Sequence, residues 1–287
     1  MKFHVIETGK FKLDGGAMFG IVPKSIWNRL NPADEHNLCT WSMRCLLVEH
    51  NDRLILVDTG MGDKQDARFK SYFHPHGEDG LVQSLMKKGF SPDQITDVFI
   101  THMHFDHVGG AVMFNQSGDL VPTFPMAAYW TSKQHYEWAL NANMREKASF
   151  LHENFVPLKE AGVLHLIDAA PDKELQWMEK ISFRFYYGHT EAMMLPEFIM
   201  DNGRKLIFMA DLLPSVGHLR LPYIMSYDIR PMITLDERYF FYDYAVSEGS
   251  YLFLEHDPNN EVFSISKDDK GNYIPGDILK LDQLQYL

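Results

Sequence analysis

Three histidines and one aspartate, His102, His104, Asp106 and His107, lie in the segment ITDVFITHMHFDHVGG at residues 95–110. They follow directly on a short apolar run that is typical of a buried β-strand. In an extended loop alternate side chains project to one side, so we expect His102, His104 and Asp106 to face one point and His107 a neighbouring one. Imidazole and carboxylate donors without a thiolate suit zinc best, and they also bind iron, manganese or cobalt. The spacing predicts a strand end that serves two neighbouring metal ions; the alternative is a polar loop of unrelated histidines.

Three later residues occupy the same kind of position, where an apolar run ends. His189 follows FRFYYG, Asp211 follows LIFMA, and His256 follows YLFLE. Taken alone, each is more typical of a hydrogen-bonded turn residue than of a metal ligand. Together with the first four residues they complete two sets of four ligands.

The elements before the metal loop are expected to be mostly strands. Residues 2–7 have strand character, and residues 43–60 predict a hairpin with Asn51 and Asp52 at its turn. Between these two elements, the glycine-rich segment LDGGAMFGIVPK predicts a turn whose apolar residues either pack under a sheet or line a pocket. A helix is predicted from Gly80 to Lys88, where a glycine ends it.

After the loop, the sequence predicts a helical insertion at about residues 129–160, whose aromatic side chains either belong to the core or cover the site. Strand character returns at residue 163, and Asp201-Asn202-Gly203 predicts the turn of a second hairpin. Thr234 and Glu237 have the spacing of a capping box and predict the start of a helix. Because no flexible linker interrupts the chain, residues 1–287 are expected to form a single domain with sheets inside and helices outside.

The composition indicates a globular protein with a sizeable core, since 45% of the 287 residues are apolar. The formal net charge of −12 disfavours nucleic acid as a partner. No apolar run reaches the length of a membrane span and the first residues are already strand-like, so we expect a cytoplasmic protein with no membrane contact. Cys39 and Cys45 would lie on one face of a strand, too far apart for a disulfide, as reduced and buried thiols.

The motif THMHFDH, followed in order by Gly-His189-Thr, Ala-Asp211 and Glu-His256, resembles the metallo-β-lactamase superfamily. The earlier VDTG resembles another element common to that family, so the resemblance covers the chain from Val57 to His256. It implies an α/β fold, an αββα sandwich of two mixed β-sheets flanked by helices, with the site at one edge.

Softer features are most similar to the branch that holds N-acyl-homoserine lactonases and methyl parathion hydrolase. These features are the glycine-rich start, the helical insertion and the short spacing between His189 and Asp211. Lactonases of that branch carry a tyrosine three residues after the bridging aspartate, whereas Pro214 stands there in this chain. His218, Tyr223 and Tyr227 are the nearby residues that could replace it.

The resemblance also implies how the ligands would be shared between two divalent metal ions, zinc being the first choice. The first ion would take His102, His104 and His189, the second Asp106, His107 and His256, and Asp211 would bridge both. Asp58 would hold a ligand loop by hydrogen bonds; the alternative is an ordinary turn aspartate.

Two adjacent dications lower the pKa of a bridging water, so the expected enzyme is a dinuclear hydrolase whose hydroxide attacks a lactone, an ester or a related electrophile. Asp106 and Asp211 are the catalytic candidates, and Asp106 would steer the nucleophile and relay its proton to the leaving group. An apolar pocket for a small-molecule substrate is expected from seven residues, Met18, Phe19, Ile21, Met61, Phe105, His218 and Tyr223.

Two other interpretations share many of these observations. A glyoxalase-II-like thioesterase or a β-lactamase-like hydrolase would use the same seven ligands and differ only in the pocket. An iron-dependent oxidoreductase similar to persulfide dioxygenase is the alternative of another class. The aromatic residues of the insertion either dimerise the protein or fold over the site.

Overall fold

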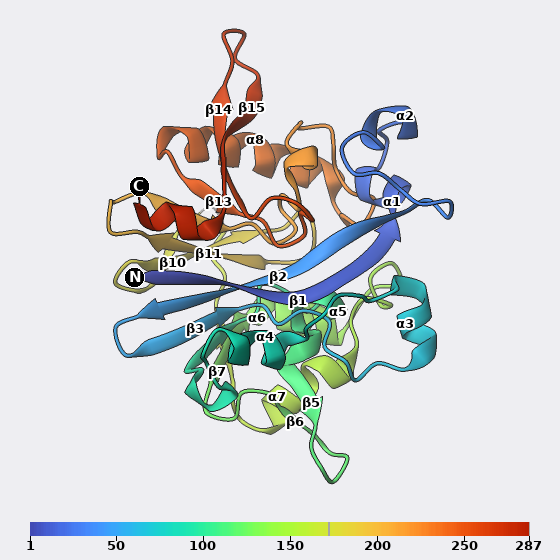
Figure 1. Ribbon diagram of the computed structural model, residues 1–287, viewed down its shortest axis with the longest axis vertical. Helices are drawn as coiled ribbons and strands as arrows, with labels where there is room; N and C mark the ends of the chain where they lie inside the picture. Colours follow the sequence, from blue (N-terminus) through green and yellow to red (C-terminus); the bar gives the residue numbers. More distant parts are fainter. Residues whose placement is uncertain (172, 287) are drawn as a thin grey trace. The chain divides into compact units, whose positions relative to one another are not determined.

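The computed structural model of the protein describes residues 1–171 and 173–286. The chain combines α-helices with two large mixed β-sheets (Figure 1), so the expected α/β class with two mixed sheets flanked by helices is confirmed. Its internal contacts divide the chain into two compact units. The first unit comprises Met1–Lys10, Met43–Ala170 and Ala192–Met194, and the second comprises Phe11–Ser42, Pro171–Glu191 and Leu195–Leu287.

A six-stranded sheet carries the first unit, in the strand order β1-β2-β3-β4-β7-β8. Its β2 and β3 form the predicted hairpin with Asn51 and Asp52 at the turn, and β3, β4, β7 and β8 run parallel to one another. The strands are β1 (Lys2–Asp14), β2 (Leu38–His50), β3 (Arg53–Val57), β4 (Asp97–Phe99), β7 (Ala128–Ser132) and β8 (Leu164–Ile167), with a separate small hairpin of β5 (Val112–Phe114) and β6 (Leu120–Pro122). The first strand is therefore longer than the expected residues 2–7.

The core of the first unit lies between this sheet and its helices. Leu81 and Leu85 of α4, which are four residues apart on one helix face, are buried with Leu47, Leu56 and Val98 of the sheet. The α-helices are α3 (Ala67–Phe73), α4 (Leu81–Lys87), α5 (Phe105–Val108), α6 (Lys133–Leu140) and α7 (Val156–Glu160), and the short 3₁₀ helices are η1 (Pro92–Gln94), η2 (Gly109–Ala111) and η3 (His152–Asn154). The stretch expected as a helical insertion at 129–160 begins within β7 and holds α6 and α7 with turns between them.

A seven-stranded sheet carries the second unit, in the order β15-β14-β13-β12-β11-β10-β9. Antiparallel pairing joins β9 to β10, β11 to β12, β13 to β14 and β14 to β15, whereas β12 and β13 pair parallel. The predicted turn Asp201-Asn202-Gly203 joins β11 to β12, and the hairpin of β14 and β15 projects at the top of Figure 1. The strands are β9 (Leu175–Met178), β10 (Ile181–Tyr186), β11 (Met193–Ile199), β12 (Lys205–Phe208), β13 (Tyr251–Phe253), β14 (Val262–Lys267) and β15 (Tyr273–Leu279).

Helix α8 (Pro231–Ser247) packs against β14 and covers part of this second sheet. The expected capping box of Thr234 and Glu237 is wrong, because the helix already begins at Pro231, whose fixed backbone angle suits the first helical position. The remaining helices of the unit are α1 (Gly15–Phe19), α2 (Lys24–Trp27), η4 (Val216–His218) and η5 (Leu281–Tyr286).

The glycine-rich segment predicted as a turn contains the short helix α1. Asp14 caps this helix, because its Oδ1 accepts a hydrogen bond from the N–H of Ala17 at 2.9 Å. Gly15 is needed there for close packing, since a Cβ at this position would lie 2.3 Å from the ring of Trp27. Met18 and Phe19 of the segment are therefore buried, whereas Ile21 is exposed.

The two cysteines lie where the sequence places them. Cys39 and Cys45 are both buried on β2, and neither forms a disulfide. They are therefore reduced thiols of the protein interior, as expected.

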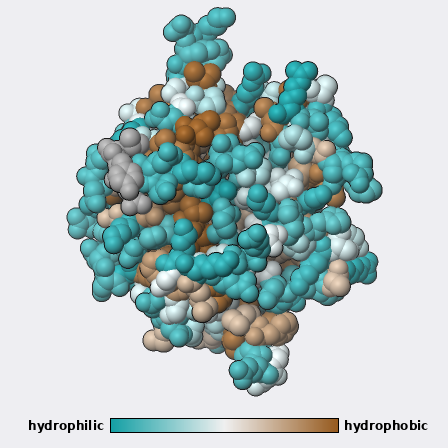
Figure 2. Space-filling view, viewed as in Figure 1, coloured by the Kyte–Doolittle hydropathy of each residue, from teal (hydrophilic) through white to brown (hydrophobic). Residues whose placement is uncertain are grey.

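The surface and the helices give two further observations. Hydrophilic residues predominate on the face drawn in Figure 2, with hydrophobic residues in small groups among them. Within residues 1–171 and 173–286, no helix is long and apolar enough to cross a membrane.

Candidate metal centre

The ligand loop of the first unit starts where β4 ends. His102 precedes a short segment that leads to His104, and His104 is the N-cap of the single helical turn α5, which carries Asp106 and His107. The extended backbone that alternation requires therefore ends at His104, and the expectation that Asp106 shares a side with His102 and His104 does not hold. Instead, the ligand atoms of Asp106 and His107 lie within 4.8 Å of each other, as do those of His102 and His104.

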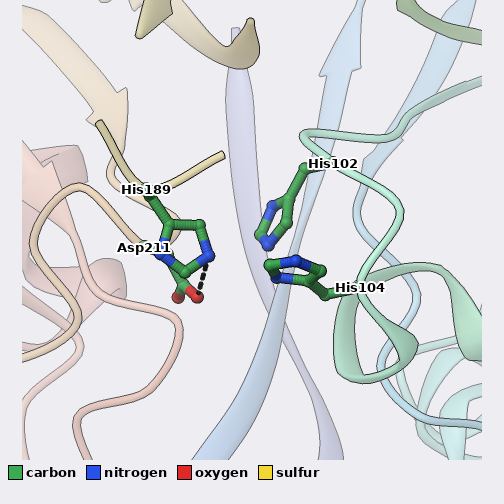
Figure 3. Close-up of side chains that lie close together, drawn as sticks. All are labelled: His102, His104, His189 and Asp211. Carbon is green, nitrogen blue, oxygen red and sulfur yellow. Dashed lines mark ion pairs between the residues drawn. The ribbon is translucent and has the colours of Figure 1, made fainter. Parts of the chain in front are cut away.

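These four side chains form a dense and buried group. The ring centroid of His102 lies 4.5 Å from that of His104 and 4.0 Å from that of His107. Figure 3 shows the imidazoles of His102 and His104 side by side. His102 and His107 have no exposed surface, whereas His104 and Asp106 are each 8% exposed. Three imidazoles packed this closely in the interior would be unfavourable as mere core residues.

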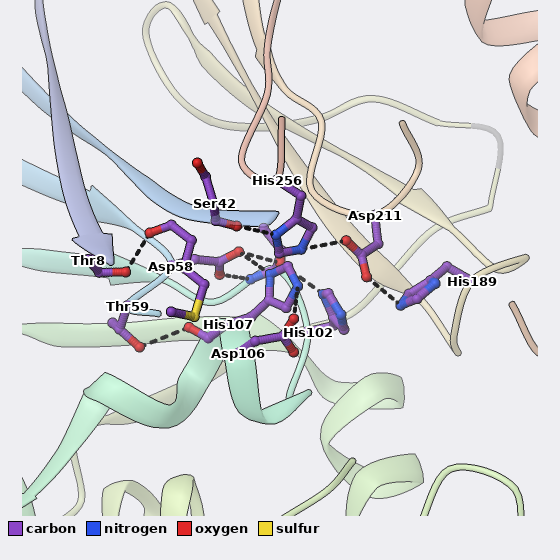
Figure 4. A network of polar contacts seen from close by, with 12 residues as sticks. Thr8, Ser42, Asp58, Thr59, His102, Asp106, His107, His189, Asp211 and His256 are labelled. Carbon is purple, nitrogen blue, oxygen red and sulfur yellow. Dashed lines mark hydrogen bonds and ion pairs between the residues drawn. The ribbon is translucent and has the colours of Figure 1, made fainter. Parts of the chain in front are cut away.

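Asp58 lies behind this loop, at the end of β3. Its carboxylate accepts hydrogen bonds from the N–H of Thr101 at 2.8 Å and the hydroxyl of Thr101 at 2.7 Å, and it lies 3.0 Å from Nδ1 of His107 (Figure 4). Thr59 adds a hydrogen bond from its hydroxyl to the carbonyl of His107 at 2.8 Å. Because Nδ1 of His107 faces a carboxylate, its Nε2 is the nitrogen left to bind a metal.

Two residues near the loop were not singled out from the sequence. Nε2 of His135 accepts a hydrogen bond from the N–H of Met103 at 2.7 Å, which fixes the backbone between His102 and His104. Glu146, which is 3% exposed, has its Oε1 3.7 Å from Nε2 of His104. Both lie in the 129–160 stretch, and neither has a position at a strand end that would have pointed to it.

In the second unit, Asp211 lies between two imidazoles. Its Oδ2 is 3.0 Å from Nε2 of His189 and its Oδ1 is 2.9 Å from Nε2 of His256, as drawn in Figures 3 and 4. Nδ1 of His256 lies 2.8 Å from the carbonyl oxygen of Ser42 and so donates to it. The three residues that follow separate apolar strands in the sequence thus meet in one buried cluster.

Asp228 completes this cluster and was not predicted. Its Oδ1 lies 2.8 Å from Nδ1 of His189, and it is 1% exposed. It follows no apolar strand and is 39 residues from His189 in the chain, so no local signal marks it.

The electrostatics of the cluster favour a cation. Burial by itself lowers the pKa of His189, but the carboxylates of Asp211 and Asp228 outweigh it and raise that pKa to about 10. Positive charge is therefore stabilised at Nε2 of His189, where a metal ion would replace the proton. Imidazole nitrogen and carboxylate oxygen are donors that zinc and similar dications accept, so the residues of both units fit such ions.

The residues predicted for the substrate pocket are distributed over both units. Met61 and Phe105 belong to the first unit, where the Phe105 ring lies 5.0 Å from Phe69 and 4.5 Å from Phe73 of α3. In the second unit, Met18 and Phe19 are buried and Ile21 is 89% exposed.

His218 and Tyr223, the other two, have different surroundings. His218 is fully buried and stacks on Phe19 at 4.3 Å, and both of its nitrogens are engaged, with the hydroxyl of Ser215 at 2.7 Å and the carbonyl of Met18 at 3.0 Å. Tyr223 is half-buried and lines a cavity of about 1180 Å³ in the second unit. Tyr227, also considered as the tyrosine replacement, is 39% exposed.

Curated proteins with a similar sequence include lactonases. An N-acyl homoserine lactonase of Bacillus thuringiensis is 30% identical over 130 residues, or 42% of this chain and 48% of the relative. The chain thus spans about half the length of the curated relatives that it matches.

Solved structures match over nearly the whole chain. A probable metal-dependent hydrolase from Staphylococcus aureus is 25% identical with a TM-score of 0.84, over 97% of this chain and 98% of that one. AidC, a dizinc quorum-quenching lactonase in complex with the product N-hexnoyl-L-homoserine, is 22% identical with a TM-score of 0.76, over 97% of this chain and 95% of its own, and so shares the fold. The model of the metallo-beta-lactamase superfamily matches residues 44–264, well over half of the sequence. The chain therefore belongs to the metallo-β-lactamase superfamily.

Proposed function

We propose that this protein is a dinuclear metal-dependent hydrolase that opens lactones or cleaves related esters. The observation that carries the proposal is that each unit gathers its candidate ligands in one buried cluster of imidazole and carboxylate groups. In the proposed centre, His102, His104 and His189 would hold one ion and Asp106, His107 and His256 the other, with Asp211 shared. Zinc is the proposed metal, because the donors contain no thiolate and the histidines outnumber the carboxylates.

Two divalent ions held in this way would supply a deprotonated water near neutral pH and stabilise negative charge on the substrate oxygen. The protein's own part is to hold the ligands still. Asp58 fixes His107 through Nδ1, and Asp228 fixes His189 in the same manner. The side chains of Asp106 and Asp211 are 11% and 10% exposed, so both carboxylates are largely buried within the clusters. Asp106 is the proposed residue for passing a proton to the leaving group.

Two observations support a lactone or ester as the substrate. Curated relatives from Bacillus thuringiensis and Agrobacterium fabrum are named N-acyl homoserine lactonases, and the solved neighbour AidC is a lactonase in complex with its product N-hexnoyl-L-homoserine. In this chain, Phe105, which stands between His104 and Asp106 in the sequence, packs against Phe69 and Phe73 and forms an apolar wall next to the ligand loop. Such a wall suits the acyl or aryl part of a substrate better than a sugar or a peptide.

The test is a hydrolysis screen across lactones, aryl esters, phosphotriesters, thioesters and β-lactams, with the metal content of the same preparation measured. We expect two zinc ions per chain and the highest kcat/KM with an acyl lactone or aryl ester. His104→Ala and Asp211→Ala should abolish turnover and lower the metal content while the protein stays folded.

Matched controls are His165→Ala and Asp168→Ala, because both side chains are exposed outside the clusters and should keep full activity. Full activity of a metal-free preparation would refute the metal-dependent reaction. A clear preference for short polar thioesters would refute the substrate class, and stoichiometric iron with oxygen consumption would favour an oxidoreductase instead.

A further inference from the structure

Helix α8 reaches two of the three loops that carry proposed ligands in the second unit, those of His189 and Asp211, through two adjacent side chains, Glu237 and Arg238. The carboxylate of Glu237 accepts hydrogen bonds from the backbone N–H groups of Tyr187 and Gly188, the latter at 3.0 Å. These are the two residues immediately before His189. Glu237 therefore holds the backbone that carries one of the proposed ligands.

The same loop is pressed against the first turn of α8. The N–H of Arg230 donates to the carbonyl of Gly188 at 2.9 Å, and its guanidinium donates to the carbonyl of Tyr187 at 2.7 Å. A Cβ on Gly188 would lie 2.3 Å from Oγ1 of Thr234, so the backbone at this point touches the helix directly. The position of His189 relative to α8 is thus defined by several bonds to the backbone just before it.

Arg238 acts on the other loop. Its guanidinium has no exposed surface, and its Nε donates to the carbonyl of Leu212, the residue after Asp211, at 2.7 Å. Its Nη1 donates to the carbonyl of Tyr223 at 2.7 Å and lies 3.4 Å from that of His218. Arg238 therefore ties the chain after Asp211 to the helix and to the segment that lines the cavity.

These two side chains are costly to place inside the protein. Burial raises the pKa of Glu237 to about 7 despite its two backbone hydrogen bonds. The hydrogen bonds of Arg238 go to carbonyl groups, and among residues 1–171 and 173–286 no carboxylate lies within salt-bridge distance of it. A charged group buried without an opposite charge destabilises a fold, so the placement of Arg238 costs stability that its hydrogen bonds to the loop carbonyls only partly offset.

We propose that Glu237 and Arg238 are positioning residues that set the separation of His189 and Asp211, so that both can bind the same metal ion. Because the two side chains are neighbours on one helix, they fix the positions of both loops relative to the same element. This inference rests on the proposed metal centre and concerns how strongly the centre binds metal.

The test compares zinc affinity, measured by competition with a chelator, in the wild type, Glu237→Gln and Arg238→Lys. Each variant preserves the approximate size of the side chain but disturbs the bonds to a loop. We expect at least a tenfold loss of affinity for one of the two ions, the range found when groups that orient metal ligands are changed. The visible spectrum of bound Co²⁺ should shift in the same variants, because the ligand geometry changes.

The control is Tyr244→Phe on the same helix. The Tyr244 hydroxyl accepts from Lys205 at 2.6 Å and donates to Glu197 at 2.8 Å, away from both loops. This variant should lose stability but keep the zinc affinity and the Co²⁺ spectrum of the wild type.

The outcomes separate the two proposals. Wild-type protein that binds fewer than two zinc ions contradicts the proposed function. If the wild type binds two and both variants bind them equally tightly with an unchanged Co²⁺ spectrum, the role of Glu237 and Arg238 is refuted. If one variant does not fold without metal, the zinc affinity and the Co²⁺ spectrum of the other variant decide whether the proposed role is refuted.

Discussion

The most direct test of how the ligand loop is held is the substitution Asp58→Asn. The Asp58 carboxylate is fully buried and receives two hydrogen bonds from Thr101 and one from Nδ1 of His107. An amide has one acceptor oxygen in place of two, so at least one of these donors loses its partner. The backbone itself should tolerate the change, because Asn readily adopts the left-handed conformation that Asp58 has at φ 56°.

The size of the effect follows from these bonds. Hydrogen bonds to a charged group contribute about 1.5–3 kcal/mol each, and a buried donor without a partner costs about 1–3 kcal/mol. We therefore expect Asp58→Asn to lower the free energy of unfolding of the metal-free protein by about 2–4 kcal/mol. Because His107 is no longer oriented by a carboxylate, zinc affinity should also fall by about 10- to 100-fold.

Asp97→Asn is the matched control. Asp97 is a fully buried carboxylate at the other end of β4, where it accepts from Arg53 at 2.7 Å, Thr96 at 2.7 Å and Trp130 at 2.9 Å. Urea unfolding should show a similar loss of stability for both variants, and chelator competition should show a loss of zinc affinity for Asp58→Asn alone. Equal zinc affinities in the two variants would refute the view that Asp58 orients His107.

Three further predictions concern other parts of the chain. Burial lowers the pKa of His218 from 6.5 to about 3, so the unfolded chain takes up a proton at a higher pH than the folded protein does. The free energy of unfolding should therefore fall by about 4 kcal/mol as the pH drops from 6.5 towards 3. His218→Gln should remove that part of the acid sensitivity in unfolding curves measured across this range. Gly109→Ala should destabilise the ligand loop and weaken zinc binding in a zinc titration, since its Cβ would lie 2.0 Å from the carbonyl oxygen of Met61. Gly80→Ala, which has open space around its Cβ, should bind zinc like the wild type. Burial raises the pKa of Cys39 to about 11, and Cys45 is buried as well. A thiol reagent should therefore label neither cysteine until denaturant is added. Rapid labelling of the native protein would show instead that β2 opens.

Local patterns in the sequence were sufficient to single out the candidate ligand residues and the strands that present them. Apolar runs that end in histidine or aspartate at residues 102, 189, 211 and 256 mark strand ends, because side-chain polarity changes where a strand leaves the core. The turns at Asn51-Asp52 and Asp201-Asn202-Gly203 were equally predictable, since few residues adopt the backbone conformations that tight hairpins need.

The residues that hold these ligands in place were decided by the tertiary structure. Asp228 lies 39 residues from His189, and Glu237 lies 49 residues from Gly188, so no short-range pattern links them. Glu237 even has the spacing of a local helix cap with Thr234, yet its carboxylate bonds to a distant loop. Ligand identity depends on the chemistry of single side chains, which can be read along the chain, whereas ligand orientation depends on which distant segments pack together when the chain folds.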